Sequence, residues 1–266
     1  MHTLRSITLL ASAIVLASPA LAGSEKKPHL DIWLHPEGKS LAVGSITEGT
    51  PGEPVDPIAR VFGAELGEDP EFPFSAPEPG FQSLPGRATA GAAFGFALPG
   101  PVLAWNGLEL VPSDHTFTLE YGPASVTSSA GFVDGFTFTA QRSGLMHIHF
   151  DFTLAGPSGD PEPGVYALAI VFDGALPVLA PSPTTWIVFN LGQDEATHDE
   201  AITFAELFLA CGIDLNGDGG VDAADLAILL GAWGSDDASS DLNGDGTVDA
   251  ADLAELLGAW GFTCPA

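Results

Sequence analysis

Two near-identical acidic loops near the C-terminus limit what this chain can fold into more than any other feature. The first reads DLNGDGGVDAAD over residues 214–225 and the second DLNGDGTVDAAD over residues 241–252, so their starts lie 27 residues apart. Calcium takes six to eight oxygen ligands, and an EF-hand loop supplies them from positions 1, 3, 5, 7, 9 and 12. Position six of both loops is glycine, which adopts the sharp turn there without strain. The repeat therefore predicts two calcium sites in preference to an acidic linker.

Each loop offers the same ordered set of oxygen ligands. The first set is Asp214, Asn216, Asp218, the Gly220 carbonyl, Asp222 and Asp225. The second set is Asp241, Asn243, Asp245, the Thr247 carbonyl, Asp249 and Asp252. Position twelve is aspartate in both loops, where the ordinary EF-hand has glutamate. Because the carboxylates repel one another without a cation, we expect this segment to fold when it binds two Ca²⁺ ions.

A short apolar segment follows each loop, LAILLGAWG after the first and LAELLGAWG after the second, and no periodic helix precedes either loop. This repeat of a loop and a helix resembles the type I dockerin module over about residues 211–266. The resemblance implies a small secreted module that folds around two calcium ions and docks onto a cohesin on another protein.

The docking surface departs from that resemblance. Familiar dockerins carry hydroxyl residues at loop positions ten and eleven, whereas this chain has Ala223, Ala224, Ala250 and Ala251 there. The segment from Cys211 onward also contains no Lys or Arg. The expected partner is therefore either cohesin-like or another surface protein, and the alternative is a compact module that serves attachment or stability.

The chain has two cysteines, Cys211 just before the first loop and Cys264 after the second apolar segment. Export to an oxidising compartment permits a disulfide. The ends of dockerin-like modules lie close together, so the resemblance implies a Cys211–Cys264 bond, which contributes about 4 kcal/mol in the chain-entropy model. Two free thiols are the alternative.

Residues 1–22 have the pattern of a secretory signal peptide, with a basic Arg5, an apolar run over 7–17 and a small-x-small site at 20–22. That run is too short to span a bilayer, and we expect no membrane span. The formal charge of −28, from 7 basic and 35 acidic residues, makes nucleic acid a poor partner. These features predict a secreted, cell-surface or periplasmic protein.

The predicted body, residues 23–210, consists of short alternating segments separated by Gly and Pro, which favours a β-sandwich. The clearest predicted strands are 29–34, 41–47, 115–121, 135–140, 147–154, 164–172 and 184–190. The stretch 48–92 predicts long loops, and Asp194 can cap a closing helix over 195–210. The predicted fold is thus mainly β: a β-sandwich body with a closing α-helix, followed by a small α-helical, dockerin-like calcium module.

The histidines are the most concentrated chemistry of the body. In HIHFDFTL (147–154), strand alternation places His147, His149 and Asp151 on one face. His29 begins the similar segment HLDIWL, and His198 lies on the closing helix. Imidazole is a common ligand of zinc and copper, so these histidines are candidate ligands for Zn²⁺ or Cu²⁺. The alternative is that they are ordinary polar residues of a half-buried strand.

The segments HLDIWL, HIHFDFTL, GVYALAIVF, TTWIVFN and QDEATHDEAITF, within residues 29–209, are together similar to a family of secreted bacterial surface proteins. Members of that family often carry a PEP-CTERM-type anchoring tail, and some are expressed under zinc limitation. Its strand pattern LHEHLDF matches His147 and His149, and His29 and His198 match the remaining histidine positions. The resemblance implies a surface or periplasmic metal-binding role.

Three functions are compatible with these features. The first is an exported, non-enzymatic protein whose body binds a transition metal and whose calcium module serves attachment or assembly. The second is a dockerin-bearing component of extracellular polysaccharide binding or degradation, with Trp33, Trp105 and Trp186 as a sugar platform. The third is a surface or matrix protein that only packs against a partner. The absence of a nucleophile-elbow, zincin or phosphate-loop motif favours a non-enzyme.

Overall fold

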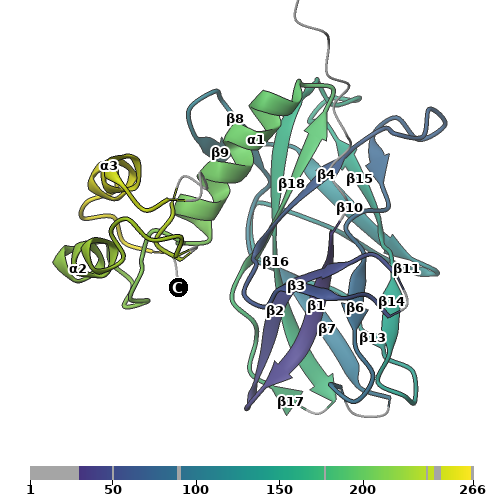
Figure 1. Ribbon diagram of the computed structural model, residues 1–266. Helices are drawn as coiled ribbons and strands as arrows, with labels where there is room; N and C mark the ends of the chain where they lie inside the picture. Colours follow the sequence, from purple (N-terminus) through teal and green to yellow (C-terminus); the bar gives the residue numbers. More distant parts are fainter. Residues whose placement is uncertain are drawn as a thin grey trace, which may run out of the picture.

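The computed structural model describes residues 30–49, 51–88, 91–176, 178–237, 239–242 and 247–264. The predicted signal peptide and His29 lie outside these ranges, and so do Asn243 and Asp245 of the second acidic loop. Figure 1 shows the strands gathered in one elongated body, with a long helix along its side and two short helices beyond that helix.

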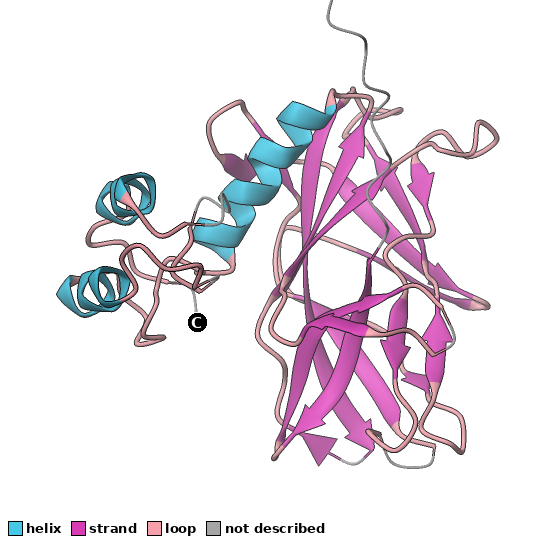
Figure 2. Ribbon diagram, in the orientation of Figure 1, coloured by secondary structure: helices cyan, strands magenta, loops and turns pink. Residues whose placement is uncertain are grey.

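Three sheets build the body (Figure 2). The five-stranded sheet has the order β14 (Met146–Ile148), β6 (Phe81–Ser83), β1 (Leu30–Glu37), β2 (Ser40–Thr47) and β3 (Pro54–Asp56). Strands β1 and β2 form an antiparallel hairpin in which Leu30 pairs with Thr47 and Glu37 with Ser40. Strand β6 joins β1 in parallel and β14 in antiparallel orientation, so the middle of the chain meets its first described strand.

The four-stranded sheet has the order β11 (Ala124–Thr127), β10 (Thr116–Tyr121), β15 (Asp151–Ala155) and β5 (Ser75–Ala76). The nine-stranded sheet has the main order β12 (Val133–Asp134), β7 (Ala93–Leu98), β16 (Gly164–Leu176), β18 (Thr185–Leu191) and β4 (Val61–Glu65). Its remaining strands are β8 (Leu103–Trp105), β9 (Leu110–Pro112), β13 (Phe138–Thr139) and β17 (Val178–Leu179).

A phenylalanine core joins the three sheets. The fully buried phenylalanines are Phe81, Phe94, Phe117, Phe150, Phe152, Phe172 and Phe189. Rings from different sheets pack directly: the Phe117 and Phe189 centroids lie 4.5 Å apart, and those of Phe81 and Phe172 lie 5.6 Å apart. Burial of such rings is the main favourable term of folding. The predicted fold class, mainly β with a short helical C-terminal region, is confirmed.

The prediction of one strand over 147–154 is wrong. The chain leaves the five-stranded sheet after β14 and enters the four-stranded sheet at β15. The apolar residues that alternate with the polar ones in this segment are nevertheless buried, because Phe150, Phe152 and Leu154 are all in the core. The stretch 48–92 is also more than loops, since it contains β3, β4, β5 and β6.

The closing helix forms as predicted. Helix α1 (Glu195–Phe204) begins after Asp194, whose carboxylate accepts a hydrogen bond from the Thr197 backbone N–H, and the π-helical turn η1 (Ala205–Leu209) continues it. Its buried Ala201 and Ala205 pack against Val165 and Val188 on the outside of the nine-stranded sheet. None of the helices in the described part of the chain is long and apolar enough to cross a membrane.

The C-terminal module contains α2 (Ala223–Gly231) and α3 (Ala250–Gly258). Its small core is formed by Ile213, Val221, Leu229, Val248 and Leu256, all fully buried. Leu207, on the last turn of the closing helix, belongs to the same cluster. The body and the module therefore share apolar contacts at their junction.

Candidate functional sites

The histidine pair of the body converges although its strand is broken. His147 lies on β14, and His149 lies in the two-residue crossing between β14 and β15. Their Nε2 atoms are 2.9 Å apart. The His147 side chain is 19% exposed and the His149 side chain 30% exposed, so solvent reaches both rings. The crossing turns the two rings toward each other rather than leaving them parallel along one strand.

The third member of this cluster is Asp31 of β1. Its Oδ2 lies 3.2 Å from His147 Nε2, although the carboxylate itself is fully buried. Two neighbours hold it: the Gly80 backbone N–H donates to Oδ1 at 3.0 Å, and the Gln82 side chain donates to Oδ2. Gln82 is in turn fixed by the Thr47 carbonyl and the Gly52 N–H. We name Asp31, His147 and His149 the Asp–His–His cluster.

The far side of the His149 ring contacts a second group of acceptors. Its Nδ1 lies 3.0 Å from the Pro77 carbonyl and 3.3 Å from Glu78 Oε1. The hydrogen bond to Glu78 is the main cause that raises the pKa of His149 to about 9, against a smaller opposing effect of burial. At neutral pH such a ring carries a proton on both nitrogens, with Nδ1 donating to these acceptors and Nε2 facing the cluster.

His198 lies in a different place, so the structure does not bring it to the histidine pair. It is buried on α1, its Nε2 lies 2.9 Å from the Val188 carbonyl, and its Nδ1 lies 3.2 Å from Glu65 Oε1. Burial disfavours the charged ring, but the bonds to Glu65 and to Val188 outweigh it and raise the pKa of His198. Glu195 completes a Glu65–Glu195–His198 group. With both ring nitrogens engaged by acceptors, the ring fastens α1 to β4 and β18.

The first acidic loop is folded around its own carboxylates. Asp214 accepts hydrogen bonds from the backbone N–H groups of Gly217, Asp218 and Gly219, the last at 2.8 Å. Gly219, at position six, has φ +93°, as the calcium-loop pattern predicts. Asp225, at position twelve, is fully buried and accepts from Asn216 N and Asp222 N.

The described part of the second loop repeats this arrangement. Asp252 is fully buried and accepts from Leu242 N at 2.8 Å and from Asp249 N at 2.7 Å. Asp249 caps α3 by accepting from Ala251 N at 2.7 Å, as Asp222 caps α2 through Ala224 N. The module has no Lys or Arg to neutralise these acids. An all-oxygen, anionic donor set with buried carboxylates fits Ca²⁺.

The two repeats exchange backbone hydrogen bonds and form one unit. Val221 of the first loop donates to the Phe262 carbonyl and accepts from Gly261 N, after the helix of the second repeat. Val248, its equivalent in the second loop, accepts from Gly234 N and donates to the Ser235 carbonyl, after the helix of the first repeat. Each loop is therefore held in place by the end of the opposite helix.

The family model of the dockerin type I domain matches residues 213–258. The dockerin resemblance of the C-terminal module is thereby confirmed, and calcium is supported as its cofactor. Dockerin domains bind cohesins and are typical of extracellular or cell-surface proteins. The likeness of the body to PEP-CTERM-type surface proteins stays a prediction. Among curated proteins, none matches this chain.

The solved structures that resemble the chain include a family 123 glycoside hydrolase from Clostridium perfringens, studied for glycolipid glycan hydrolysis. The likeness has 8% sequence identity and a TM-score of 0.25, and it covers 50% of this chain and 23% of that enzyme. The chain thus spans about a quarter of the enzyme's length.

The dockerin-like module is closed by the predicted disulfide. Cys211 and Cys264 are bonded, with their Cα atoms 5.8 Å apart, and Cys211 adopts φ +58° at the point where the chain enters the module. A backbone bond from Cys264 N to the Gly219 carbonyl lies beside it. The bond therefore joins the two ends of the module, as the resemblance implies.

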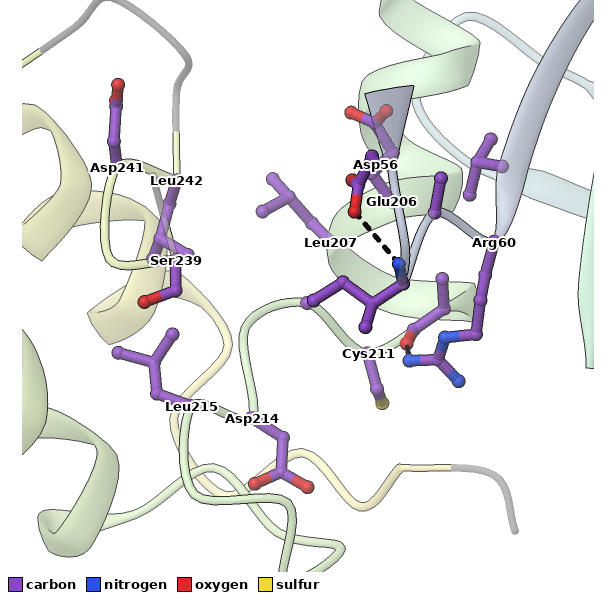
Figure 3. A pocket seen from close by; sticks show the side chains of 15 residues that line it. Asp56, Arg60, Glu206, Leu207, Cys211, Asp214, Leu215, Ser239, Asp241 and Leu242 are labelled. Carbon is purple, nitrogen blue, oxygen red and sulfur yellow. Dashed lines mark hydrogen bonds between the residues drawn. The ribbon is translucent and has the colours of Figure 1, made fainter. Parts of the chain in front are cut away.

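A cavity of about 420 Å³ lies at the junction of the body and the dockerin-like module. Figure 3 shows Arg60 on the body side of it, and Asp214 and Asp241, the first residues of the two acidic loops, on the module side. The Arg60 guanidinium donates to the Ala210 carbonyl at the end of the closing helix. Burial lowers the pKa of Arg60. The Arg60 side chain thus joins the body to the end of the closing helix, and both acidic loops border the junction.

The outer surface of the dockerin-like module carries a repeated pair of apolar side chains. Leu230 and Leu257 are each 51% exposed, and Trp233 and Trp260 are each 47% exposed. These are equivalent positions of the two repeats. Exposed tryptophan is typical of protein-binding surfaces. The sequence-based prediction of the docking surface rested on the loop alanines and the lack of Lys and Arg, and it did not include these four side chains, although the repeated GAW segments contained the signal.

Of the three tryptophans proposed as a sugar platform, Trp33 lies in the five-stranded sheet, whereas Trp105 and Trp186 pack against the cluster beneath the closing helix. Trp33 is buried and stacks on His35, with ring centroids 3.9 Å apart. Trp105 borders a small cavity that it shares with Gln193 and Glu200. A platform of three coplanar indoles is therefore not formed.

Proposed function

We propose that this protein is an exported component of an extracellular or cell-surface assembly, attached through its dockerin-like module when that module holds two calcium ions. The single observation that supports this most is the mutual support of the two loops, each fixed by the end of the opposite helix. Loading one loop then favours the folded form of the other, because both share one small core.

The proposed calcium ligands are those of the loop pattern, with Asp225 and Asp252 as the buried position-twelve carboxylates. The proposed partner is a cohesin-type surface protein. The Leu–Trp pairs, with Leu230 and Leu257 on α2 and α3 and Trp233 and Trp260 just after these helices, supply the apolar part of its binding surface. The loop alanines are small and uncharged and offer a partner few contacts. We therefore expect the partner to contact the helices more than the loop ends.

The test is capture of the full-length protein on a panel of immobilised cohesins, with calcium and with chelator. We expect capture only with calcium, and Trp233→Ala combined with Trp260→Ala should weaken binding by at least 2 kcal/mol, about 30-fold, because exposed tryptophans are common binding hot spots. Phe132→Ala is the matched control, since Phe132 is an exposed aromatic residue of the body.

A separate arm tests the calcium ligands. Asp225→Ala and Asp252→Ala should each abolish binding of one calcium ion and weaken capture, whereas Asp236→Ala, an exposed acid between the loops, should leave both unchanged. Capture that is equally strong in chelator would refute the proposed mode of attachment.

For the body, we propose transition-metal binding through His147 and His149 in preference to polysaccharide binding. The convergence of the two Nε2 atoms at 2.9 Å favours the metal role, and the burial of Trp33 disfavours a sugar platform of three tryptophans. His198 has no part in this site, because its ring nitrogens face Glu65 and Val188. A glycan-array screen of the full-length protein discriminates between the two roles. If the body binds a metal and not a polysaccharide, no glycan on the array should bind in a way that Trp105→Ala abolishes.

A further inference from the structure

We propose that Asp31, His147 and His149 form a site for a single first-row divalent transition-metal ion, with Asp31 as the third ligand and at least one coordination position open to solvent. This inference rests on the proposed role of the body and deepens it, because it assigns the complete ligand set, the outer partners and the class of ion.

The three ligand atoms stand at distances that suit one ion. His147 Nε2 lies 2.9 Å from His149 Nε2 and 3.2 Å from Asp31 Oδ2, and all three atoms lie within 4.8 Å of one another. Two atoms that each lie about 2.0–2.1 Å from a tetrahedral ion are roughly 3.3 Å apart. Small rotations of the imidazoles therefore bring the cluster to coordination distance without movement of the strands.

Hydrogen bonds alone do not satisfy all three ligand atoms of this cluster. His147 Nε2 faces both His149 Nε2 and the Asp31 carboxylate. A single ring nitrogen either donates to the carboxylate or accepts from the other imidazole, and it cannot do both. A cation among the three atoms interacts favourably with all of them at once. This is the physical reason to prefer a metal site over a chain of ordinary hydrogen bonds.

The surroundings have the form of outer partners that orient metal ligands. His149 donates from Nδ1 to the Pro77 carbonyl and faces Glu78, which leaves its Nε2 directed to the cluster. Asp31 is fixed from both of its oxygens, by Gly80 N–H and by Gln82. All of these partners come from the segment 77–82 and its neighbours, so one stretch of chain orients two of the three ligands.

The donor set selects the class of ion. Two imidazole nitrogens with one carboxylate oxygen suit zinc, iron(II) or copper, whereas calcium prefers oxygen alone. Three protein ligands leave a position for water, and the partly exposed rings of His147 and His149 provide a path from solvent. The chain therefore separates its two metal chemistries: calcium in the dockerin-like module and a transition metal in the body.

The test uses the full-length protein with calcium at a saturating concentration, so that the acidic loops hold Ca²⁺ and not the probe ion, which is zinc. Chelator-treated protein is titrated with zinc by calorimetry, and the bound ions are counted by elemental analysis. We expect one zinc ion per chain. His147→Gln and Asp31→Asn should each weaken zinc binding by more than about 100-fold, beyond the range for the loss of an outer partner.

Matched controls make the same chemical changes elsewhere. His115→Gln and Asp151→Asn alter a histidine and an exposed aspartate outside the cluster and should bind zinc as the wild type does. Glu78→Gln should weaken zinc binding by about 10–100-fold, as expected for a positioning residue. Circular dichroism and the count of calcium ions show whether each variant is folded.

X-ray absorption of the zinc-loaded wild type reports the ligand set without any variant, and we expect two imidazoles and oxygen donors. Wild-type protein that binds no zinc overturns both this inference and the proposed role of the body. Zinc that is lost in His147→Gln but kept in Asp31→Asn overturns only the inference. Neither result affects the proposed attachment, because the zinc site and the acidic loops are separate sites. Accordingly, Asp225→Ala and Asp252→Ala should leave zinc binding unchanged.

Discussion

Gly80 allows the Asp–His–His cluster to form, because its backbone lies against two of the three ligands. A Cβ at this position would stand 2.7 Å from His149 Cε1 and 2.8 Å from Asp31 Oδ1. The Asp31 carboxylate is buried and accepts hydrogen bonds from Gly80 N–H and from the Gln82 side chain. Neither neighbour can yield without disturbing the site. The absence of a side chain is therefore a requirement of the cluster's geometry.

We expect Gly80→Ala to separate Asp31 from the histidines. The substitution should destabilise the body by about 1–3 kcal/mol, as overpacking does, and it should weaken zinc binding. Denaturant unfolding and zinc titration measure the two effects. Gly100→Ala is the control, since a Cβ there has nothing within 4 Å and Gly100 has no positive φ. Equal zinc binding by the two alanine variants would show that Gly80 does not shape the site.

At the scale of elements, the sequence predicted what depends on local pattern and missed what depends on pairing. The loop ligands follow fixed spacing, and the closing helix follows its cap at Asp194, so both were predictable. The pairing of His147 with His149 was predicted from strand alternation, but the structure brings the two rings together through the break between β14 and β15. Their separation from His198 was not predictable, since it depends on which sheet the closing helix covers.

The outer partners of the cluster could not be predicted. Glu78, Gly80 and Gln82 belong to a Pro- and Gly-rich stretch that has the composition of loops. Its strand β6 has only three residues, and it exists because β1 and β14 accept it on both sides. Pairing with segments far away in the sequence decides such a strand, whereas intrinsic propensity decides little. Likewise, the break between β14 and β15 follows from a change of sheet that alternation alone does not reveal.

The docking of the closing helix should depend on pH through His198. Its pKa is raised in the folded protein, so the charged ring stabilises the helix fully below the unfolded value of about 6.5. This stabilisation is lost as the pH rises through the folded pKa. Hydrogen bonds to charged groups contribute about 1.5–3 kcal/mol, which sets the expected scale.

Measurement of the unfolding free energy across pH 6–9, for wild type and His198→Gln, checks this prediction. The difference between them should be largest at the acidic end and shrink toward the alkaline end. His115→Gln is a suitable comparison, because burial lowers the pKa of His115 and its loss should not produce this trend. A difference that grows with pH would contradict the assigned charge of His198.

At the scale of the whole molecule, two parts with hydrophobic cores of different size meet at one junction. The body has a large phenylalanine core, whereas the dockerin-like module has a few aliphatic side chains, two acidic loops and a disulfide. Phe208 and Phe262 pack edge to face across the junction, and Arg60 bonds to Ala210. These contacts join the two parts, but they are few beside either core, so we expect the module to unfold independently of the body.

Calorimetry of the full-length protein should therefore show two transitions, of which the lower belongs to the dockerin-like module. Closing a segment of 53 residues contributes about 4 kcal/mol in the chain-entropy model, so Cys211→Ser with Cys264→Ser should lower that transition strongly. Added calcium should raise it again, because the ions bind only the folded loops. The upper transition should respond to neither change. A single transition that moves with both calcium and the cysteines would mean that the junction couples the two parts into one cooperative unit, with Phe208, Phe262 and Arg60 as the first residues to substitute.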